Sequence, residues 1–403
     1  MTDHNEQSSR VRVLHVGKYF PPDPGGMETY LRDLMMSSVS MGTRSAALVH
    51  RSRASIQSIE ERYQSNEISV AITRVASWFR LLFTPISPTF PLALSRMIKR
   101  QRPSILHLHL PNPSTFWALL LPSARRLPWV IHWQSDVLTP KSSRLLRLCY
   151  PFYQPLESAL LSHASQIITT SPQYLHSSKT LARYKQRCCV IPLGISDRFD
   201  PSHGQEWDKR ANSPLRVLGI GRLAHYKGFD ILLRAIAHTQ DTELDLVGHG
   251  EQFDHLKSLS RALAIEDRIR FHGVVSDTER DSLLQACDCL CLPSVDRTES
   301  FGIVLLEAMS AGKPCVISKV PGSGMTSVVE AESTGLVVPP EDSGALAAAF
   351  GRLTQNRRLL TEMGMRGRQR FEMNLTIEAS TRSVIAVYDA LDATSETLPQ
   401  DVS

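Results

Sequence analysis

The chain has 403 residues, more than one hydrophobic core normally supports, so we expect two domains. Hydrophobic residues make up 42%, enough for globular packing, and no stretch approaches the run of roughly 18 apolar residues that a membrane-spanning helix needs. The first ten residues are polar and lack the apolar core of a signal peptide, so we expect a cytoplasmic location.

Charge is distributed unevenly along the chain. Residues 1–200 carry 24 basic and 12 acidic side chains, whereas residues 201–403 carry 21 basic and 28 acidic ones. The basic first half favours contact with an anionic acceptor or surface, and the acidic second half argues against a general nucleic-acid binder. These charges could equally be scattered over a solvated surface.

Short apolar strands alternate with helical stretches, a pattern typical of parallel sheets covered by helices. In the first half the expected strands are Arg12–Val16, Ser45–Val49, Ile68–Thr73, Ser104–Leu108, Trp129–Trp133, Gln166–Thr169 and Cys188–Ile191. In the second half they are Leu215–Gly219, Leu244–Val247, Arg268–Phe271, Cys287–Leu292, Pro314–Ile317 and Gly335–Val338.

Domain boundaries follow from this pattern. We expect a first Rossmann-like domain over 1–200, a linker over 201–214 and a second Rossmann-like domain over 215–375, followed by a helix over 376–392. The linker is polar and contains Pro201, Gly204 and Pro214, which punctuate regular structure.

Three sites where a strand meets a helix or loop could bind phosphate. Gly25 and Gly26 come where the first strand hands over to the first helix, and exposed amides there suit an anion, although the pair could simply cap the helix. Arg222 and Lys227 follow the strand that ends near Gly221 and could neutralise a diphosphate without a metal ion. A further pair, Gly248 and Gly250, suits a turn beneath such a ligand.

The most informative stretch runs from Glu299 to Glu307. Glu299 lies in an expected strand-to-helix loop, and Gly302 lets the backbone approach a ligand closely. Glu307 interrupts the apolar run of the following helix, where an unpaired carboxylate would be costly. Amides at that helix start favour phosphate, and a carboxylate further in can accept two ribose hydroxyls. The donor residues here are Ser300, Phe301, Gly302, Ile303 and Glu307.

This stretch resembles the signature of the retaining glycosyltransferases of family 4, which adopt the two-domain GT-B fold. Five further segments match the family in order: Gly17–Glu28, His132–Asp136, Ile191–Ile195, Gly221–Asp230 and Gly248–Glu251. His249 and Glu251 depart from the family pattern, which commonly has an acidic or small residue and a proline there. The resemblance covers roughly residues 11 to 392.

The resemblance implies an α/β GT-B fold with two Rossmann-like domains facing each other across a cleft and a C-terminal helix that crosses back to the first domain. It places acceptor binding in the first domain, at Gly26, His109 and Asp136, and donor binding in the second. It also implies catalytic roles for Glu299, His132, Arg222 and Lys227, with no metal ion and no cofactor beyond the nucleotide sugar. The chain has no Asp-x-Asp triplet that could chelate a metal.

The expected activity is retaining transfer of a hexose onto a lipid-linked glycan in bacterial surface polysaccharide synthesis, for O-antigen or exopolysaccharide. Mannose from GDP-mannose is favoured and glucose from UDP-glucose is next. Segments 78–83 and 144–148 mix apolar bulk with cations, consistent with peripheral contact at the inner membrane or with ordinary core packing. The alternatives are an enzyme acting on a soluble sugar and an inactive sugar-nucleotide-binding partner of an assembly complex.

Overall fold

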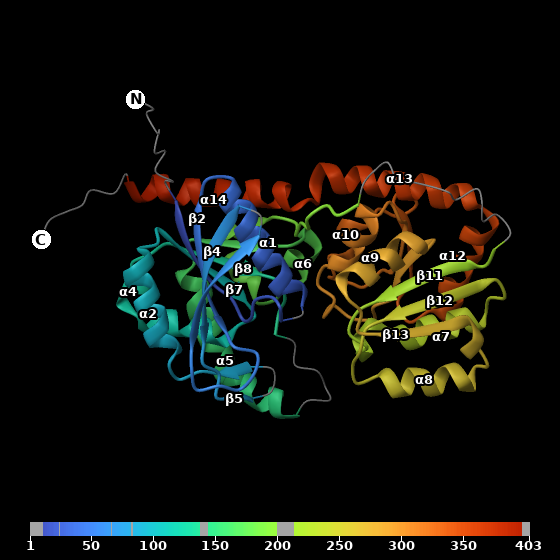
Figure 1. Ribbon diagram of the computed structural model, residues 1–403, viewed down its shortest axis with the longest axis horizontal. Helices are drawn as coiled ribbons and strands as arrows, with labels where there is room; N and C mark the ends of the chain where they lie inside the picture. Colours follow the sequence, from blue (N-terminus) through green and yellow to red (C-terminus); the bar gives the residue numbers. More distant parts are fainter. Residues whose placement is uncertain are drawn as a thin grey trace, which may run out of the picture. The chain divides into compact units, whose positions relative to one another are not determined.

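The computed structural model describes residues 11–23, 25–65, 67–81, 84–137, 144–199 and 213–396. The chain forms two compact α/β units (Figure 1). Unit 1 consists of the residues up to Thr170, Ser178–Pro192 and the residues from Ile377 onward, and unit 2 consists of Ser171–Ser177 and Leu193–Thr376. Each unit is described by itself below.

Unit 1 is built on an eight-stranded sheet in the order β10-β9-β8-β7-β1-β2-β4-β3. Its strands are β1 (Arg12–Val16), β2 (Arg44–His50), β3 (Ile59–Ser65), β4 (Ile68–Val75), β7 (Ile105–Leu110), β8 (Trp129–Trp133), β9 (Gln166–Thr169) and β10 (Cys188–Val190). All neighbours pair in parallel except β3 and β4, which are antiparallel. The seven expected strands are therefore present, and the edge strand β3 was not predicted.

A small hairpin of β5 (Phe79–Leu81) and β6 (Thr84–Ile86) was not predicted either. The helices of unit 1 are α1 (Gly26–Ser40), α2 (Phe90–Gln101), α3 (Trp117–Leu120), α4 (Pro122–Arg125), α5 (Arg144–His163) and α14 (Ile377–Glu396). None of the helices within the described ranges is long and apolar enough to cross a membrane.

The C-terminal helix α14 belongs to unit 1, as the GT-B resemblance implies. Its buried positions Ile377, Ser380, Thr381, Val384 and Tyr388 recur with helical spacing. The fully buried Tyr388 hydroxyl lies 2.5 Å from His107 Nδ1 on β7. Tyr30 of α1 and Ser380 hydrogen-bond through their hydroxyls at 3.0 Å. The helix therefore closes one face of the first sheet through specific polar contacts as well as apolar packing.

Unit 2 contains a six-stranded sheet, parallel throughout, in the order β13-β12-β11-β14-β15-β16. Its strands are β11 (Leu215–Ile220), β12 (Thr242–Val247), β13 (Ile269–Gly273), β14 (Cys289–Leu292), β15 (Cys315–Ser318) and β16 (Gly335–Val338). Its helices are α6 (Pro172–Ser177), α7 (Phe229–Ala237), α8 (Phe253–Ala262), α9 (Asp277–Ala286), α10 (Ile303–Ser310), α11 (Met325–Val328), α12 (Ser343–Gln355) and α13 (Arg357–Asn374). All six expected strands are present.

The units divide at other positions than the expected 200 and 215. Segment 193–199 groups with unit 2, because Ile195 hydrogen-bonds through its backbone to Leu375 and Asp197 pairs with Arg368 of α13 at 2.5 Å. Segment 171–177 also groups with unit 2. Most of the expected linker over 201–214 lies outside the described residues.

Tyr388→Phe should destabilise unit 1 by about 1 kcal/mol, because the buried His107 ring loses a hydrogen-bond partner. The measurement is the free energy of unfolding in urea. Ser383→Ala serves as the control, since it removes an exposed side-chain hydrogen bond from the same helix and should have no measurable effect. Equal stability of Tyr388→Phe and the wild type would contradict the role given to this contact.

Candidate functional site

A buried ion pair lies at the carboxyl edge of the second sheet. Lys227 ends a short 3-10 turn that follows β11, and Glu299 lies in the loop between β14 and α10. Lys227 Nζ donates to Glu299 Oε2 at 2.5 Å, and both residues are only 8% exposed. Ser294 Oγ donates to the same oxygen at 3.4 Å. The structure thus joins two residues that the sequence predicted separately as catalytic.

The electrostatics of this pair favour its charged form. Burial by itself disfavours the ammonium, but the Glu299 carboxylate and the hydrogen bond to it outweigh burial, so the pKa of Lys227 is raised. The Glu299 loop is also fixed through its backbone. Ser323 Oγ donates to the Glu299 carbonyl at 2.5 Å, and the Gly324 amide donates to the Ser300 carbonyl at 2.7 Å.

Helix α10 begins immediately after this loop. Gly302 caps it with φ of +83°, a left-handed conformation that favours glycine, and Phe301 beside it is 2% exposed. Ile303 is the first residue of the helix, so the free amides of its first turn come directly after the loop that carries Glu299. An anion held by Lys227 would therefore also have helix amides within the same loop region.

Glu307 is held by other residues than Lys227. It lies in α10, and its side chain is 14% exposed. Arg198 Nη2 lies 3.3 Å and Arg280 Nε lies 3.7 Å from the same oxygen, Oε1. Burial raises the pKa of Glu307, and the two guanidinium groups oppose that rise. The sequence predicted a free-energy cost for burying this carboxylate unpaired. Two cations reduce that cost.

Arg222 lies at the surface of unit 2. Its guanidinium pairs with Glu251 at 3.1 Å, and the two side chains are 58% and 52% exposed. Gly248 and Gly250 bring the loop after β12 against the loop after β11. A Cβ on Gly248 would lie 1.9 Å from the Gly221 carbonyl oxygen, and one on Gly250 would lie 2.5 Å from that of Leu223. Any larger residue at either position would separate these loops.

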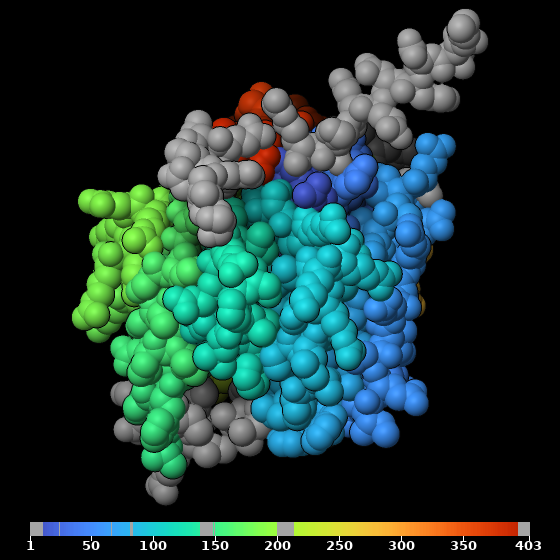
Figure 2. All heavy atoms as spheres, turned by 90° about the vertical axis from the view of Figure 1, so that its left-hand side faces the viewer, coloured from blue at the N-terminus to red at the C-terminus, as the bar shows by residue number. Residues whose placement is uncertain are grey.

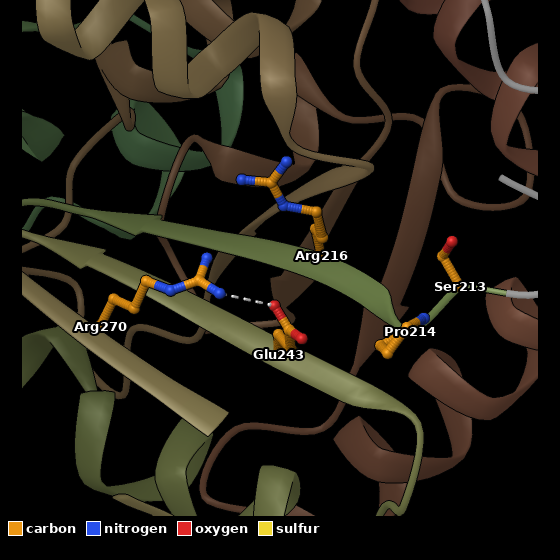
Figure 3. A pocket seen from close by; sticks show the side chains of 5 residues that line it. All are labelled: Ser213, Pro214, Arg216, Glu243 and Arg270. Atoms are coloured by element: carbon orange, nitrogen blue, oxygen red, sulfur yellow. Dashed lines mark hydrogen bonds and ion pairs between the residues drawn. The ribbon is translucent and has the colours of Figure 1, made fainter. Parts of the chain in front are cut away.

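A hollow of about 330 Å³ lies elsewhere in unit 2 and is lined by Ser213, Pro214, Arg216, Glu243 and Arg270 (Figure 3). Because Arg216 and Glu243 come at the start of β11 and β12, this hollow lies at the amino edge of a parallel sheet, opposite the edge that carries Lys227. Arg270 pairs with Glu243 at 3.2 Å, and Arg216 pairs with Asp245 at 3.4 Å. The hollow therefore lies away from the edge at which open α/β sheets bind their ligands.

In unit 1, Gly25 caps α1, and both Gly25 and Gly26 are exposed. The Glu28 carboxylate folds back over this cap, so that a Cβ on Gly25 would lie 2.1 Å from Glu28 Oε2. Asp136 follows β8 and accepts hydrogen bonds from the Trp133 indole at 2.9 Å and the Ser178 hydroxyl at 2.8 Å. These contacts hold Asp136 in place after the strand that carries His132.

Four histidines share one buried face of the first sheet: His15, His107, His109 and His132. His15 Nδ1 and His109 Nε2 lie 3.1 Å apart, and the rings of His107 and His109 stack with centroids 4.4 Å apart and planes 19° apart. His109 is 6% exposed and the other three are fully buried, so neither predicted site histidine reaches the surface of this structure.

This cluster is better explained by neutral stacked rings than by metal binding. One nitrogen from each of His15, His107 and His109 lies within 4.8 Å of the others. Ligands of one ion must aim their in-plane lone pairs at a common point, roughly 2 Å away, whereas His15 Nδ1 and His109 Nε2 share a hydrogen bond and the rings of His107 and His109 are stacked. Burial lowers the pKa of His15 and of His132 to about 3, and it lowers those of His107 and His109 well below the usual value.

Comparison with known proteins assigns both units. Residues 25–194 match the family described as "Glycosyl transferase 4-like domain", and residues 205–370 match "Glycosyl transferases group 1". Each unit thus matches a glycosyltransferase domain, the second one of group 1, and the chain has the GT-B fold. It is 28% identical to O-antigen chain mannosyltransferase C of Escherichia coli, an alignment that covers 94% of this chain and 99% of that protein.

Two further proteins extend this comparison. D-rhamnosyltransferase WbpZ of Pseudomonas aeruginosa is also 28% identical, over 91% of this chain and 92% of its own length. The fold matches sucrose-phosphate synthase of Thermosynechococcus elongatus with a TM-score of 0.77 at 22% identity, covering 95% of this chain and 100% of that one. This confirms the expected fold of two Rossmann-like domains.

The group 1 region contains Lys227, Glu299 and Glu307, but the sequence did not indicate several of their partners. Arg280 belongs to an ordinary amphipathic helix, α9, and Arg198 lies outside both matched regions. Ser294 and Ser323 support Glu299 through single hydroxyl groups. Nothing in their spacing pointed to these roles, because the contacts of Arg198, Arg280 and Ser323 join segments far apart in sequence, and Ser294 stands in no recognisable motif.

Lys227→Ala should lower the free energy of unfolding of unit 2 by about 3 kcal/mol, because it leaves the Glu299 carboxylate buried and uncompensated. The double variant Lys227→Ala/Glu299→Ala should recover part of that loss in urea denaturation. Arg358→Ala, which breaks a surface ion pair with Glu362, is the control and should change stability by less than about 1 kcal/mol. Strictly additive effects of the two substitutions would contradict the buried pair.

Unit 1 should be sensitive to mild acid. The buried histidines are neutral in the folded chain, so the unfolded chain binds more protons below its histidine pKa near 6.5, and stability falls as the pH drops. Burial raises the pKa of Glu157 to about 7, which opposes this trend by roughly one proton. The net loss between pH 7 and pH 5.5 should be about 3 kcal/mol.

Fluorescence of the buried Trp129 and Trp133 during urea unfolding measures this loss, because both residues lie in unit 1. A midpoint that does not move between pH 7 and pH 5.5 would show that these histidines do not titrate as buried neutral groups.

Proposed function

We propose that the chain is a retaining, metal-independent hexosyltransferase that moves a sugar from a nucleoside diphosphate onto a lipid-linked glycan in bacterial surface polysaccharide synthesis. The observation that carries this proposal is the buried Lys227–Glu299 pair at the carboxyl edge of the second sheet. Open α/β sheets bind their ligands at this edge, and a cation beside a carboxylate suits a phosphate linked to a hexose. The location implied by this function is cytoplasmic, peripheral to the inner membrane.

These residues would act on three parts of the donor: the diphosphate, the hexose and the ribose. The Lys227 ammonium and the Arg222 guanidinium neutralise the departing diphosphate, together with amides at the start of α10. Glu299 accepts hydroxyls of the hexose and fixes its orientation, and Glu307 accepts the ribose hydroxyls. Arg222 would have to exchange its exposed contact with Glu251 for the phosphate, which costs little for a surface pair.

Retention follows from attack on the same face as the leaving group. The bond between the anomeric carbon and the phosphate oxygen breaks, and the acceptor hydroxyl oxygen bonds to that carbon while its proton passes to the departing phosphate. The protein then contributes orientation and charge stabilisation and needs no covalent intermediate. No divalent ion enters this scheme, because Lys227 and Arg222 supply the positive charge.

GDP-mannose is the favoured donor, and similarity to an O-antigen chain mannosyltransferase supports it. Similarity to a D-rhamnosyltransferase at the same identity shows that related chains differ in the sugar they transfer. UDP-glucose stays the next candidate.

We assign acceptor binding to unit 1, through Gly26, Asp136 and His109, with His132 as a catalytic residue near the reacting sugar. Gly26 is exposed and Asp136 partly so, whereas the two buried histidines would need the side chains above them to move. A lipid-linked acceptor is supported by exposed apolar residues of this unit. Leu148, Phe152 and Leu156 recur every four residues along α5 and are 69%, 78% and 45% exposed. Figure 2 shows the face of unit 1 that lies at the left of Figure 1, where segments coloured blue to green form the surface.

A donor panel tests the proposal. GDP-mannose, UDP-glucose and their free nucleotides are added to the full chain, and its melting temperature is measured with and without EDTA. A ligand that binds only the folded state raises the melting point, so GDP-mannose should raise it most and EDTA should not reduce the effect. Glu299→Gln should weaken binding of the nucleotide sugar about tenfold while leaving that of the free nucleotide within about twofold.

Activity completes this test, with NMR of the product's anomeric proton reporting retention or inversion. A melting point unmoved by every nucleotide sugar, or turnover lost in EDTA, would contradict the proposal. Transfer to free sugars without lipid would favour a soluble acceptor. Donor binding with no turnover on any membrane extract would favour an inactive binding partner.

A further inference from the structure

Glu307 is held by two arginines that approach one side of its carboxylate. Arg198 reaches it from segment 193–199, and Arg280 reaches it from the first turn of α9. Both guanidinium groups face Oε1, at 3.3 Å and 3.7 Å. Among the described residues the hydrogen bond to this carboxylate, from Arg198, goes to Oε1, and none goes to Oε2. One oxygen is therefore fixed, and the other is left for a ligand.

Glu307 lies among several other acidic and basic side chains. Asp281 Oδ1 lies 3.5 Å from Arg198 and 3.6 Å from Arg280, so Glu307 shares both cations with a second carboxylate. Arg280 also pairs with the exposed Asp277 at 3.0 Å. On the α13 side of α10, Arg368 is bound to Asp197 and to the Ser310 carbonyl. Within this set the charge on Glu307 depends on Arg198 and Arg280.

An ionised carboxylate is the stronger acceptor for hydroxyl groups, and its hydrogen bonds are roughly twice as strong as neutral ones. A protonated Glu307 would place a hydrogen where the ligand's own hydroxyl hydrogen should lie. Burial pushes Glu307 towards that protonated form. The two arginines thus act against burial at the group that must accept.

We propose that Arg280 and Arg198 are positioning residues for donor binding: they keep Glu307 ionised and turn Oε2 towards the ribose hydroxyls of the nucleoside diphosphate. The inference rests on the proposed function, because it assigns Glu307 to the ribose. It extends that function by naming residues that touch no substrate and yet set the affinity for the nucleotide part of the donor.

A double-mutant cycle, in which both the arginine and the 2′-hydroxyl of the ligand are varied, separates this role from a purely structural one. Calorimetry compares a nucleoside diphosphate with its 2′-deoxy form, using GDP or UDP, whichever binds the wild type better. The wild type should prefer the ribonucleotide about tenfold, because the 2′-hydroxyl donates to a charged acceptor. Arg280→Met should reduce this preference to about twofold, and Arg280→Lys should restore most of it. A residue that only stabilises the fold would weaken both ligands equally and leave the preference at tenfold.

Arg352→Met is the matched control, because it breaks an exposed arginine–glutamate pair with Glu332 in the same unit. It should bind both ligands as the wild type does. Arg198→Met should act in the same direction as Arg280→Met and provides the same test if the latter does not fold. An unchanged ribose preference in folded Arg280→Met and Arg198→Met would overturn the inference and leave the proposed function standing. A wild type that binds no nucleotide would overturn both.

The pH dependence gives a second readout. Affinity should fall as the pH drops through the pKa of Glu307, because the ionised form accepts the hydroxyls. Removing Arg280 raises that pKa further, so the loss should begin at a higher pH in Arg280→Met than in the wild type, with affinity regained at alkaline pH. Coincident profiles in the two proteins would contradict the role of Arg280.

Discussion

The constraint on which the second unit depends is the burial of Lys227 against Glu299. A charge taken out of water is costly unless it is paired, and here the partner comes from another loop of the same sheet edge. The pair therefore fixes the loop after β11 to the loop before α10, and the backbone contacts of Ser323 and Gly324 hold the latter in place. An anionic ligand that reaches Lys227 meets a site whose parts are already in position.

Glu307 is a second largely buried charged group, and its pairing differs from that of Lys227. Lys227 and Glu299 neutralise each other one to one, whereas Glu307 shares two arginines with Asp281. The Lys227 ammonium has three N–H donors, so it can contact Glu299 and a phosphate together, and Glu307 can offer a carboxylate oxygen to a hydroxyl. Under the proposed function these groups would meet the diphosphate and the ribose of one nucleotide sugar. In unit 1, by contrast, the buried polar cluster of histidines stays neutral and binds the sheet to α14.

Sequence reasoning located the parallel core strands because each is a short apolar run, and it located Glu299 and Lys227 because they follow such strands. It missed β3, whose exposed, charged residues carry no apolar signal at a sheet edge. It predicted a phosphate-binding role for Arg222 but not the exposed contact of this side chain with Glu251. It assigned Lys227 and Glu299 separate roles, so their pairing was not foreseen. Contacts between distant segments, such as Arg198 with Glu307, have no local signature.

Crystallography of the full chain with bound GDP-mannose or UDP-glucose, in buffer free of divalent ions, tests the central claim most directly. The account predicts that the Lys227 ammonium bridges a diphosphate oxygen and the Glu299 carboxylate, with hexose hydroxyls on Glu299 and no metal density beside the phosphates. A diphosphate bound away from Lys227, or one that appears only when a divalent ion is added and bound to it, would contradict the account.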